Sequence, residues 1–377
     1  MDRDTKGETA NPGARRDAPE TLMIAGGGTG GHVYPAIAIA REFVSRDRSR
    51  RVVFVGTARG LEQRIVPAAG FPLEILDVGG LKGKSAPAIL RNLLRLPGSF
   101  VGAWRIISRY RPVVALGVGG YASGPVLVAA ALRGIPTLIQ EQNAFPGITN
   151  RILARFVKEV AVAFPEALTR LRREGSVTGN PVRREFFEMR SEPSASGPVR
   201  LLIFGGSQGS RVLNDAMSSA LFFLATLKGK LEIVHQTGTA DVERVREAYR
   251  TSPFPEATVV PYLDEMAREM ARATLVVSRA GAITLGELAA IGRGAILVPF
   301  ALASDNHQEV NARAVEATGG AIVVTEKDLT GEKLAGAIIR LTEDQARLVD
   351  MGKRFHALAA AEAAAKIVDI VERISKD

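Results

Sequence analysis

The chain has 377 residues and an ordinary apolar content, which is enough material for two domains with separate cores. It contains no cysteine, which excludes disulfides and thiolate metal sites, and no apolar run reaches the ~20 residues that a membrane-spanning helix needs. The net charge of +9 arises in the first half, which carries +11 up to Thr178 against −2 for the remainder. This asymmetry indicates an anionic partner: a nucleic acid, a membrane surface or a phosphorylated substrate.

Residues 1–20 are polar and mixed in charge, and we expect a disordered tail there. Strand-like runs then alternate with helical patterns, and turn residues around 179–181 and 191–198 divide them into two series. The alternation predicts an α/β fold of two Rossmann-like, doubly wound domains, 21–180 and 181–349, that face each other across a cleft. The expected strands are 22–25, 52–55, 113–116, 137–139, 159–163, 199–204, 231–235, 258–261, 275–278, 295–299 and 321–324.

A final helix is expected from about Thr342 to Ser375, rich in alanine and with apolar residues at helical spacing. Its segment from about 350 to 375 either ends the second domain or crosses back to pack on the first.

The first expected strand runs into a glycine-rich turn, Gly26-Gly27-Gly28-Thr29-Gly30-Gly31-His32, which a helix follows. Glycines let the backbone approach a bulky anion, and the helix N-terminus offers N–H groups without partners. The turn contains G-x-G-x-x-G, but the strand 52–55 ends in Gly56-Thr57, without the carboxylate that would hold the ribose of a nicotinamide cofactor. Anion binding is therefore favoured over a dinucleotide site, and a turn of purely packing value is the alternative.

His32 is the candidate catalytic residue because it combines a titratable ring with this turn. The positive end of the helix disfavours the imidazolium form, so the neutral ring can accept a proton from an attacking hydroxyl. A histidine that only hydrogen-bonds the loop is the alternative interpretation.

Further polar turns follow other expected strands, at 117–125, 140–143, 205–210 and 278–287. The pattern predicts that 205–210 is a second anion-binding turn. Glu287 falls about one helical turn into the helix after the last of them, where a carboxylate can bind two ribose hydroxyls or simply compensate the helix dipole. We expect no cofactor and no metal, since the four histidines are scattered and the only D-x-D motif lies in the tail.

No acidic residue occurs between Asp77 and Glu141, and apolar residues recur at helical spacing from Ile89 to Ile107 in this stretch. One interpretation is a core helix kinked at Pro97. The other, which we favour, is a basic amphipathic face that contacts acidic lipid. The candidate residues for contact with the membrane and a lipid-linked acceptor are Lys82, Lys84, Arg91, Arg95 and Trp104.

Taken together, the spaced segments resemble the MurG family of bacterial N-acetylglucosaminyltransferases. The resemblance extends from about Leu22 to the C-terminal helix and lies in GGGTGGHVYPAIAIA, GGYASGP, EQNAFPGITN, GNPVR, GGSQGS, SRAGAITLGE and DNHQEVNA. Several matches in the right order are far more specific than the lone glycine motif.

The resemblance implies a GT-B fold and an inverting, metal-independent transfer of GlcNAc. The donor would be UDP-GlcNAc, the acceptor the 4-hydroxyl of MurNAc in lipid I (undecaprenyl-pyrophosphoryl-MurNAc-pentapeptide), and the product lipid II for peptidoglycan synthesis. It also implies a peripheral place on the cytoplasmic side of the inner membrane, an anionic membrane surface as a partner, and cell-wall synthesis or division proteins as further partners. Carried over by similarity, His32 would deprotonate the acceptor, Glu287 would bind the ribose, and the UDP-GlcNAc contacts would be Thr29, Gly30, Gly31, Asn143, Arg183, Ser207, Leu263, Ala282, Ile283, Thr284, Leu285, Gly286, Glu287 and Gln308.

Two other functions compete with this one. Another GT-B lipid glycosyltransferase, such as a diacylglycerol glycosyltransferase, would share the donor turns. A nucleic-acid-binding protein would fit the sequence pI of about 10, but basic residues interleaved with aromatics are missing, and we expect no nucleic acid partner.

Overall fold

The structure is a computed structural model that describes residues 19–58, 60–79, 86–191, 197–301 and 306–376, with only the backbone for 86–95. The tail expected at 1–20 lies outside these residues except for Pro19 and Glu20. In the described part of the chain the strands form two fully parallel sheets.

The first sheet has the strand order β3-β2-β1-β4-β5-β6-β7, and six helices connect its strands. Its strands are β1 (Thr21–Ala25), β2 (Arg51–Gly56), β3 (Leu73–Ile75), β4 (Val114–Gly117), β5 (Thr137–Glu141), β6 (Glu159–Val162) and β7 (Ser176–Val177). The helices are α1 (Gly30–Arg46), α2 (Glu62–Ala68), α3 (Ala86–Tyr110), α4 (Ser123–Leu132), α5 (Ile148–Leu153) and α6 (Pro165–Leu171).

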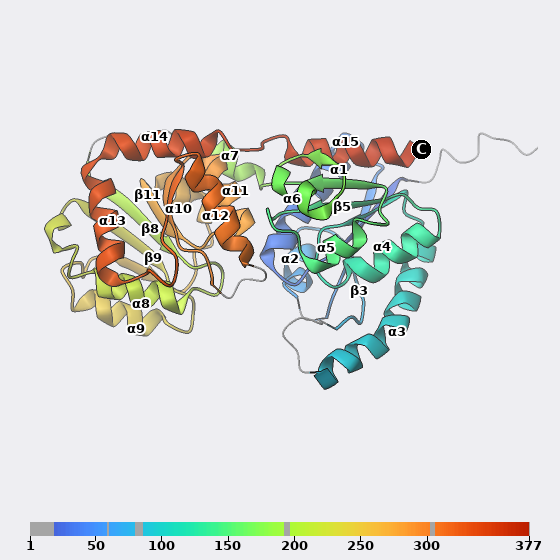
Figure 1. The fold of residues 1–377 in the computed structure, drawn as a ribbon, viewed down its shortest axis with the longest axis horizontal. Coiled ribbons are helices and arrows are strands. Elements are labelled where there is room, and N and C mark those ends of the chain that lie inside the picture. The colour runs from blue at the N-terminus through green and yellow to red at the C-terminus, as the bar shows by residue number, and fades with distance from the viewer. Residues whose placement is uncertain (1–18, 59, 80–85, 192–196, 302–305, 377) are drawn as a thin grey trace, which may run out of the picture.

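The second sheet repeats the same order, β10-β9-β8-β11-β12-β13. Its strands are β8 (Val199–Phe204), β9 (Leu231–Gln236), β10 (Thr258–Val260), β11 (Leu275–Ser278), β12 (Gly294–Leu297) and β13 (Ala321–Val323). The helices of this half are α7 (Arg184–Glu188), α8 (Arg211–Ala220), α9 (Val242–Arg250), α10 (Met266–Arg272), α11 (Ala282–Ile291), α12 (His307–Ala317), α13 (Gly331–Glu343) and α14 (Gln345–His356), with a short 3₁₀ turn at Ala225–Leu227. Figure 1 shows the two α/β domains side by side.

Strands β1 and β8 each contain a run of four apolar residues, Leu22–Ala25 and Leu201–Phe204, because helices cover both faces of each sheet. In β1, Leu22 and Ile24 face one core while Met23 and Ala25 face the other. Strand β8 divides in the same way between two cores of the second domain. This explains why continuous apolar runs, without alternation, predict these strands correctly.

Two edge strands, β3 and β7, are absent from the strands predicted above. They have only three and two residues, and their side chains are half-buried or exposed. Short edge strands carry neither an apolar run nor a clear alternation, so the sequence gives little signal for them.

The single final helix expected from about Thr342 to Ser375 is wrong, because α13 ends at Glu343 and two separate helices follow, α14 and α15 (Ala363–Lys376). Residues between α14 and α15 carry the chain from the second domain to the first, and Figure 1 shows the two red helices along the same side of the molecule. The segment between α14 and α15 lies close to Gly179, in the earlier connection between the domains. A Cβ on Gly179 would lie 2.2 Å from the Cβ of Ala360. Gly179 also has φ +79°, a conformation that favours glycine. Both the backbone angle and the lack of space for a Cβ therefore require glycine at this position.

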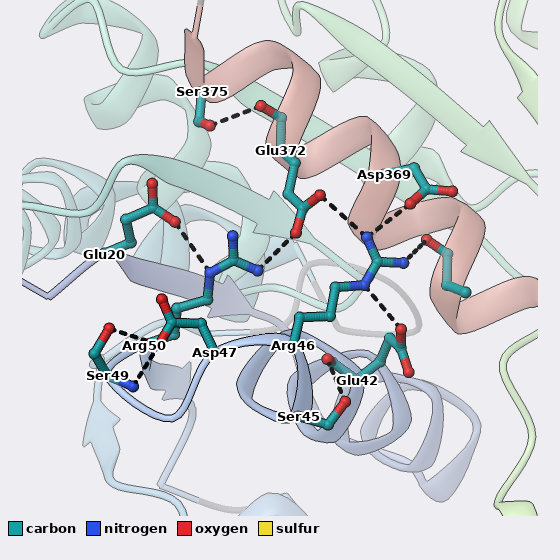
Figure 2. A network of polar contacts seen from close by, with 11 residues as sticks. Glu20, Glu42, Ser45, Arg46, Asp47, Ser49, Arg50, Asp369, Glu372 and Ser375 are labelled. Carbon is teal, nitrogen blue, oxygen red and sulfur yellow. Dashed lines mark hydrogen bonds and ion pairs between the residues drawn. The ribbon is translucent and has the colours of Figure 1, made fainter.

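Helix α15 packs on the first domain. Its apolar side chains, from Ile367 to Ile374, join the core formed by β1 and α1. Its acidic face meets two arginines of the α1 region: Arg46 contacts Asp369 at 2.7 Å, and Arg50 contacts Glu372 at 2.6 Å (Figure 2). The last helix therefore completes the first domain although it follows the second in the chain.

In each sheet the strand order reverses next to the first strand of the domain, between β1 and β4 and between β8 and β11. Ligands of doubly wound folds bind at the carboxyl ends of the strands at this switch point. The glycine turns predicted from the sequence follow β1 and β4 in the first domain and β8 and β11 in the second. The topology therefore brings the candidate site residues to the functional edge of each sheet.

Candidate active site

The glycine turn after β1 leaves the N-terminus of α1 open. Gly28 has φ +95°, a conformation that a side chain would strain, and Thr29 at the N-cap makes no side-chain capping bond. Among the described residues, no acceptor pairs with the N–H groups of Gly30 and Gly31. These N–H groups, at the positive end of a helix of 17 residues, can bind an anionic group.

His32 lies in the first turn of α1 and is partly accessible. Its Nδ1 lies 3.0 Å from the carbonyl oxygen of Gly27. On its other side, a Cβ on Gly119, in the turn after β4, would lie 2.9 Å from Nε2. The ring is thus held between the two glycine turns at the switch point of the first sheet.

The N-terminus of α11 in the second domain is open in the same way. Gly281 at the N-cap offers no side chain, and the N–H groups of Ala282, Ile283 and Thr284 find no acceptor within the described chain. Leu285 differs, because its N–H donates to Gly281 and its side chain lies in a core of the second domain. Leu285, although predicted as a donor contact, therefore has both its N–H and its side chain engaged within the second domain.

Glu287 lies one turn further along α11, is buried, and is paired with Arg183 at 3.1 Å. A Cβ on Gly286 would lie 2.8 Å from the side chain of Val182, so the glycine allows the segment before Arg183 to approach the helix. Burial raises the pKa of Glu287 to about 7, and the neighbouring Arg183 guanidinium opposes this rise.

The Arg183 guanidinium also joins the two domains. Its central carbon lies 4.8 Å from the centre of the Tyr34 ring on α1, within the range of a cation–π contact. Burial raises the pKa of Tyr34, with the nearby Tyr262 adding to the rise. Arg183 therefore contacts both Tyr34 on α1, two residues after His32 in the sequence, and Glu287 on α11, and so joins the two helices that carry the candidate base and the candidate ribose contact.

Gln236, at the end of β9, forms hydrogen bonds to the two segments that carry the predicted donor contacts Ser207 and Leu263. Its Nε2 donates to the carbonyl of Gly206, beside Ser207, and its Oε1 accepts the N–H of Leu263 at 2.9 Å. Ser207 is exposed and Leu263 half-buried, so both can contact a ligand at the edge of the second sheet.

A second direct link between the domains involves the turn after β5 and α12. The side chain of Asn311 donates to Oδ1 of Asn143 at 3.2 Å and accepts the N–H of Ala144 at 2.9 Å. Gln308, one turn earlier on α12, holds the end of the β12 loop through the N–H of Phe300. Asn143 and Gln308, predicted from distant segments, thus lie on elements that touch.

The candidate membrane residues are only partly described. Lys82 and Lys84 lie outside the described residues, and Arg91 and Arg95 lie in α3 where only the backbone is described. Trp104 is 40% exposed and lies under the guanidinium of Arg133. The expected apolar stripe of α3 is divided, since Ile107 is fully buried in the core. Large apolar side chains of α3 and α4 that are exposed are Leu96, Val101, Trp104, Val128 and Leu132.

No helix in the described part of the chain combines the length and apolar character needed to cross a membrane. Across the same residues, no three His, Asp or Glu side chains gather in a way that could hold a metal ion.

Two family models match the chain: the glycosyltransferase family 28 N-terminal domain at residues 22–162 and the family 28 C-terminal domain at 200–371. The chain is 49% identical over 351 residues to the UDP-N-acetylglucosamine--N-acetylmuramyl-(pentapeptide) pyrophosphoryl-undecaprenol N-acetylglucosamine transferase of Anaeromyxobacter sp. strain K, covering 93% of this chain and 91% of that protein. The enzyme of the same name from Myxococcus xanthus is 48% identical over 352 residues, with the same two coverages. The crystal structure of Acinetobacter baumannii MurG matches with a TM-score of 0.78 and 31% identity, over 94% of this chain and 100% of that one.

The chain belongs to the MurG family of glycosyltransferases. The GT-B fold predicted from the sequence is confirmed by the two parallel-sheet domains and by this likeness.

Two buried carboxylates of this family member are missing from the predicted site. Glu141 accepts the N–H of Asn143 at 2.9 Å, the N–H of Gly147 at 3.0 Å and the side-chain amide of Asn150 at 2.9 Å, and so shapes the whole turn after β5. Glu62 lies beneath the first glycine turn. The signal for Glu141 was present as a polar cluster after a strand, whereas Glu62 follows an unremarkable loop and only the fold brings it to the site.

Proposed function

We infer that this protein transfers GlcNAc from UDP-GlcNAc to the 4-hydroxyl of MurNAc in lipid I and so forms lipid II for peptidoglycan synthesis. Relatives at 43–49% identity carry the name of this transferase, as the solved MurG structure carries the name of the family. The observation in the structure that best supports the assignment is that Arg183 contacts both Tyr34 on α1 and Glu287 on α11, because this joins the helix of the candidate base to the candidate nucleotide site.

We propose that the second domain holds the nucleotide. The open N–H groups at 282–284 face the anionic end of the donor, and the carboxylate of Glu287 accepts hydrogen bonds from the ribose hydroxyls. Ser207, Leu263 and Gln308 complete the donor contacts on this side. Thr29, Gly30, Gly31 and Asn143 contact the donor from the first domain, and Ile283, Thr284, Gly286 and Arg183 frame the ribose.

We propose that His32 is the general base. In the transfer step, the 4-oxygen of MurNAc attacks C1 of GlcNAc from the face opposite UDP, and the bond from C1 to the β-phosphate oxygen breaks. The electron pair leaves with UDP, and the hydroxyl proton passes to Nε2 of His32. Helix N-termini stabilise the negative charge that develops on the leaving group, without a divalent cation.

We propose that the protein binds peripherally to the cytoplasmic face of the inner membrane. The exposed apolar side chains of α3 and α4, together with the nearby Arg105, Arg109 and Arg133, form a surface suited to an anionic bilayer. Because the acceptor is lipid-linked, this surface would bring the acceptor domain close to its substrate. Trp104 lies on this surface, and the proposal keeps Lys82, Lys84, Arg91 and Arg95 as membrane contacts on the grounds of the sequence alone.

The test is a transferase assay with a lipid I analogue and radiolabelled UDP-GlcNAc in the presence of EDTA. We expect a labelled disaccharide product with the chelator present. A folded protein that binds UDP but gives no product would contradict the acceptor assignment, and activity that EDTA abolishes and Mg²⁺ restores would contradict the metal-independent step.

A further inference from the structure

Glu62 is the first residue of α2, and its carboxylate lies directly beneath the glycine turn that carries His32. It is only 1% exposed. Oε2 accepts the N–H of Gly28 at 2.7 Å, while Oε1 accepts the N–H and the hydroxyl of Thr57, each at 2.9 Å. Both oxygens of this buried carboxylate are therefore committed to neighbouring backbone and hydroxyl groups.

The glycines around Glu62 are required by its position. A Cβ on Gly27 would lie 2.3 Å from the Glu62 carboxyl carbon, and a Cβ on Gly56 would lie 2.6 Å from its Cγ. The turn therefore leaves room for this side chain as well as for a ligand.

The peptide bond between Gly27 and Gly28 links Glu62 to His32. Its N–H donates to Glu62, and its carbonyl oxygen lies 3.0 Å from Nδ1 of His32. A carbonyl oxygen can only accept, so Nδ1 must carry the hydrogen. The neutral ring then has its free lone pair on Nε2, the nitrogen that faces Gly119.

The peptide group is also confined from the other side. A Cβ on Gly120 would lie 2.7 Å from the carbonyl oxygen of Gly27, so the turn after β4 closes over that oxygen. The peptide plane is held between Glu62 and this second turn, and its carbonyl direction fixes the orientation of the imidazole.

We propose that Glu62 is a positioning residue that sets the tautomer of His32 through the Gly27–Gly28 peptide. A carboxylate that accepts from the N–H end polarises the peptide and strengthens the hydrogen bond that its carbonyl accepts from Nδ1. When Nε2 takes a proton, the same polarised carbonyl stabilises the positive ring, as a carboxylate does when it contacts a catalytic histidine directly. The proposal rests on the proposed role of His32 as the base.

The experiment has a readout that needs no acceptor substrate. Long-range ¹⁵N–¹H NMR of the full chain, labelled at histidine, reports which ring nitrogen carries hydrogen, and the His32 signal is assigned by its loss in His32→Gln. We expect the Nδ1–H tautomer of His32 in the wild type and a mixture of tautomers in Glu62→Gln, whose single amide oxygen cannot accept from both Gly28 and Thr57. An Nε2–H tautomer in the wild type would overturn the proposal whether or not any variant folds.

His235 provides an internal reference in the same spectrum. Its Nε2 faces the side-chain oxygen of Asn214 and its Nδ1 faces the hydroxyl of Tyr249, each at 3.1 Å. Asn214 uses its amide hydrogens on Thr237 and Asp241, so His235 carries its hydrogen on Nε2. This opposite tautomer should be unchanged in Glu62→Gln.

Kinetic measurements distinguish a role of Glu62 in orienting His32 from a role in holding the glycine turn in shape. In Glu62→Gln we expect kcat to fall about 10–100-fold, the loss that is typical when a residue that orients a metal-binding histidine is mutated. We expect Kd for UDP to stay within about twofold. The matched control is Thr57→Val, which removes a hydroxyl from the other carboxylate oxygen and should leave both kcat and the tautomer unchanged. Equal losses of kcat and UDP affinity in Glu62→Gln, or an unchanged His32 tautomer, would overturn the proposal. Wild-type protein without transferase activity but with the Nδ1–H tautomer would instead count against the proposed function alone.

Discussion

The glycine turns after β1 and β8 share a sequence pattern but differ in what holds them. Beneath the first turn lies a buried acid, Glu62, and the helix that follows has no side-chain cap. At the second turn, Ser210 caps α8 by accepting the N–H of Leu213, and the Arg279 guanidinium donates to the same hydroxyl at 2.6 Å. The same strand–turn–helix unit is thus acidic and open in one domain, and basic and capped in the other.

This difference indicates that the two glycine turns have different functions. An acid beneath the first turn suits a histidine that must become positive, whereas the arginine beside the second turn is paired with Glu326 at 2.6 Å and helps to hold the capping serine. The sequence predicted two anion-binding turns, but of the two helices that follow glycine turns after β8 and β11 in the second domain, α11 is uncapped and α8 is capped. The predictions below test this comparison of the two domains.

The largest effect should follow His32→Ala. Loss of the general base should lower kcat about 10²–10⁴-fold, while UDP affinity stays within about twofold because the nucleotide is held by the second domain. Steady-state kinetics and calorimetric UDP titration measure the two quantities on one preparation. Unchanged turnover would remove His32 as the base.

Glu287→Ala should mainly weaken UDP binding, whereas His32→Ala mainly lowers kcat. Losing the charged acceptor for the ribose hydroxyls should weaken UDP binding about 10–100-fold. The matched control is Glu185→Ala, which removes the other carboxylate that contacts Arg183, at 2.9 Å, and should change UDP affinity no more than about twofold. Equal effects of the two variants would mean that the Arg183 ion pair matters and the ribose contact does not.

Glu287 should also make stability depend on pH. Its pKa is raised by burial from 4.5 to about 7 in the folded protein, so the folded state binds the proton more tightly than the unfolded state. The stability this gives is fully present below about pH 4.5 and is lost as the pH rises through about 7, amounting to about 3 kcal/mol. Relative to Glu287→Gln, the wild type should be more stable at pH 5 than at pH 8 in urea unfolding. A stability difference that does not change with pH would contradict the raised pKa of the buried Glu287 side chain.

Membrane binding should belong to the first domain alone. Leu132 on α4 is 68% exposed, and Leu132→Ser should weaken partition into anionic vesicles about 10-fold through lost apolar burial. The control is Phe222→Ser in the second domain, where Phe222 is 64% exposed and should make no contact with lipid. Sedimentation with vesicles measures both, and equal losses would contradict a membrane surface on α3 and α4.

The smallest effect concerns the two helix caps. Ser210→Ala should cost about 1 kcal/mol of folding stability, because it removes the cap of α8. Thr29→Ala should cost a few tenths of a kcal/mol at most, because Thr29 makes no capping bond. Chemical unfolding of the two variants compares them directly, and similar losses would show that the two turns are held in the same way.

Much of the fold could be predicted from the sequence because the central strands are continuous apolar runs that end in glycine turns. The positions of His32 and Glu287 followed from these turns. Glu62 could not be predicted, since only the pairing of β1 with β2 brings α2 beneath the glycine turn. The break before α15 was also missed, because an alanine-rich stretch such as 357–363 has high helix propensity and only the crossing between domains interrupts it.

Hydrogen–deuterium exchange with and without UDP, in EDTA, tests the central claim most directly. The account predicts that UDP slows amide exchange at the open helix ends, at 282–284 on α11 and at 30–31 on α1, and leaves the capped end of α8 at 211–213 unchanged. Protection at 211–213 without protection at 282–284 would contradict it.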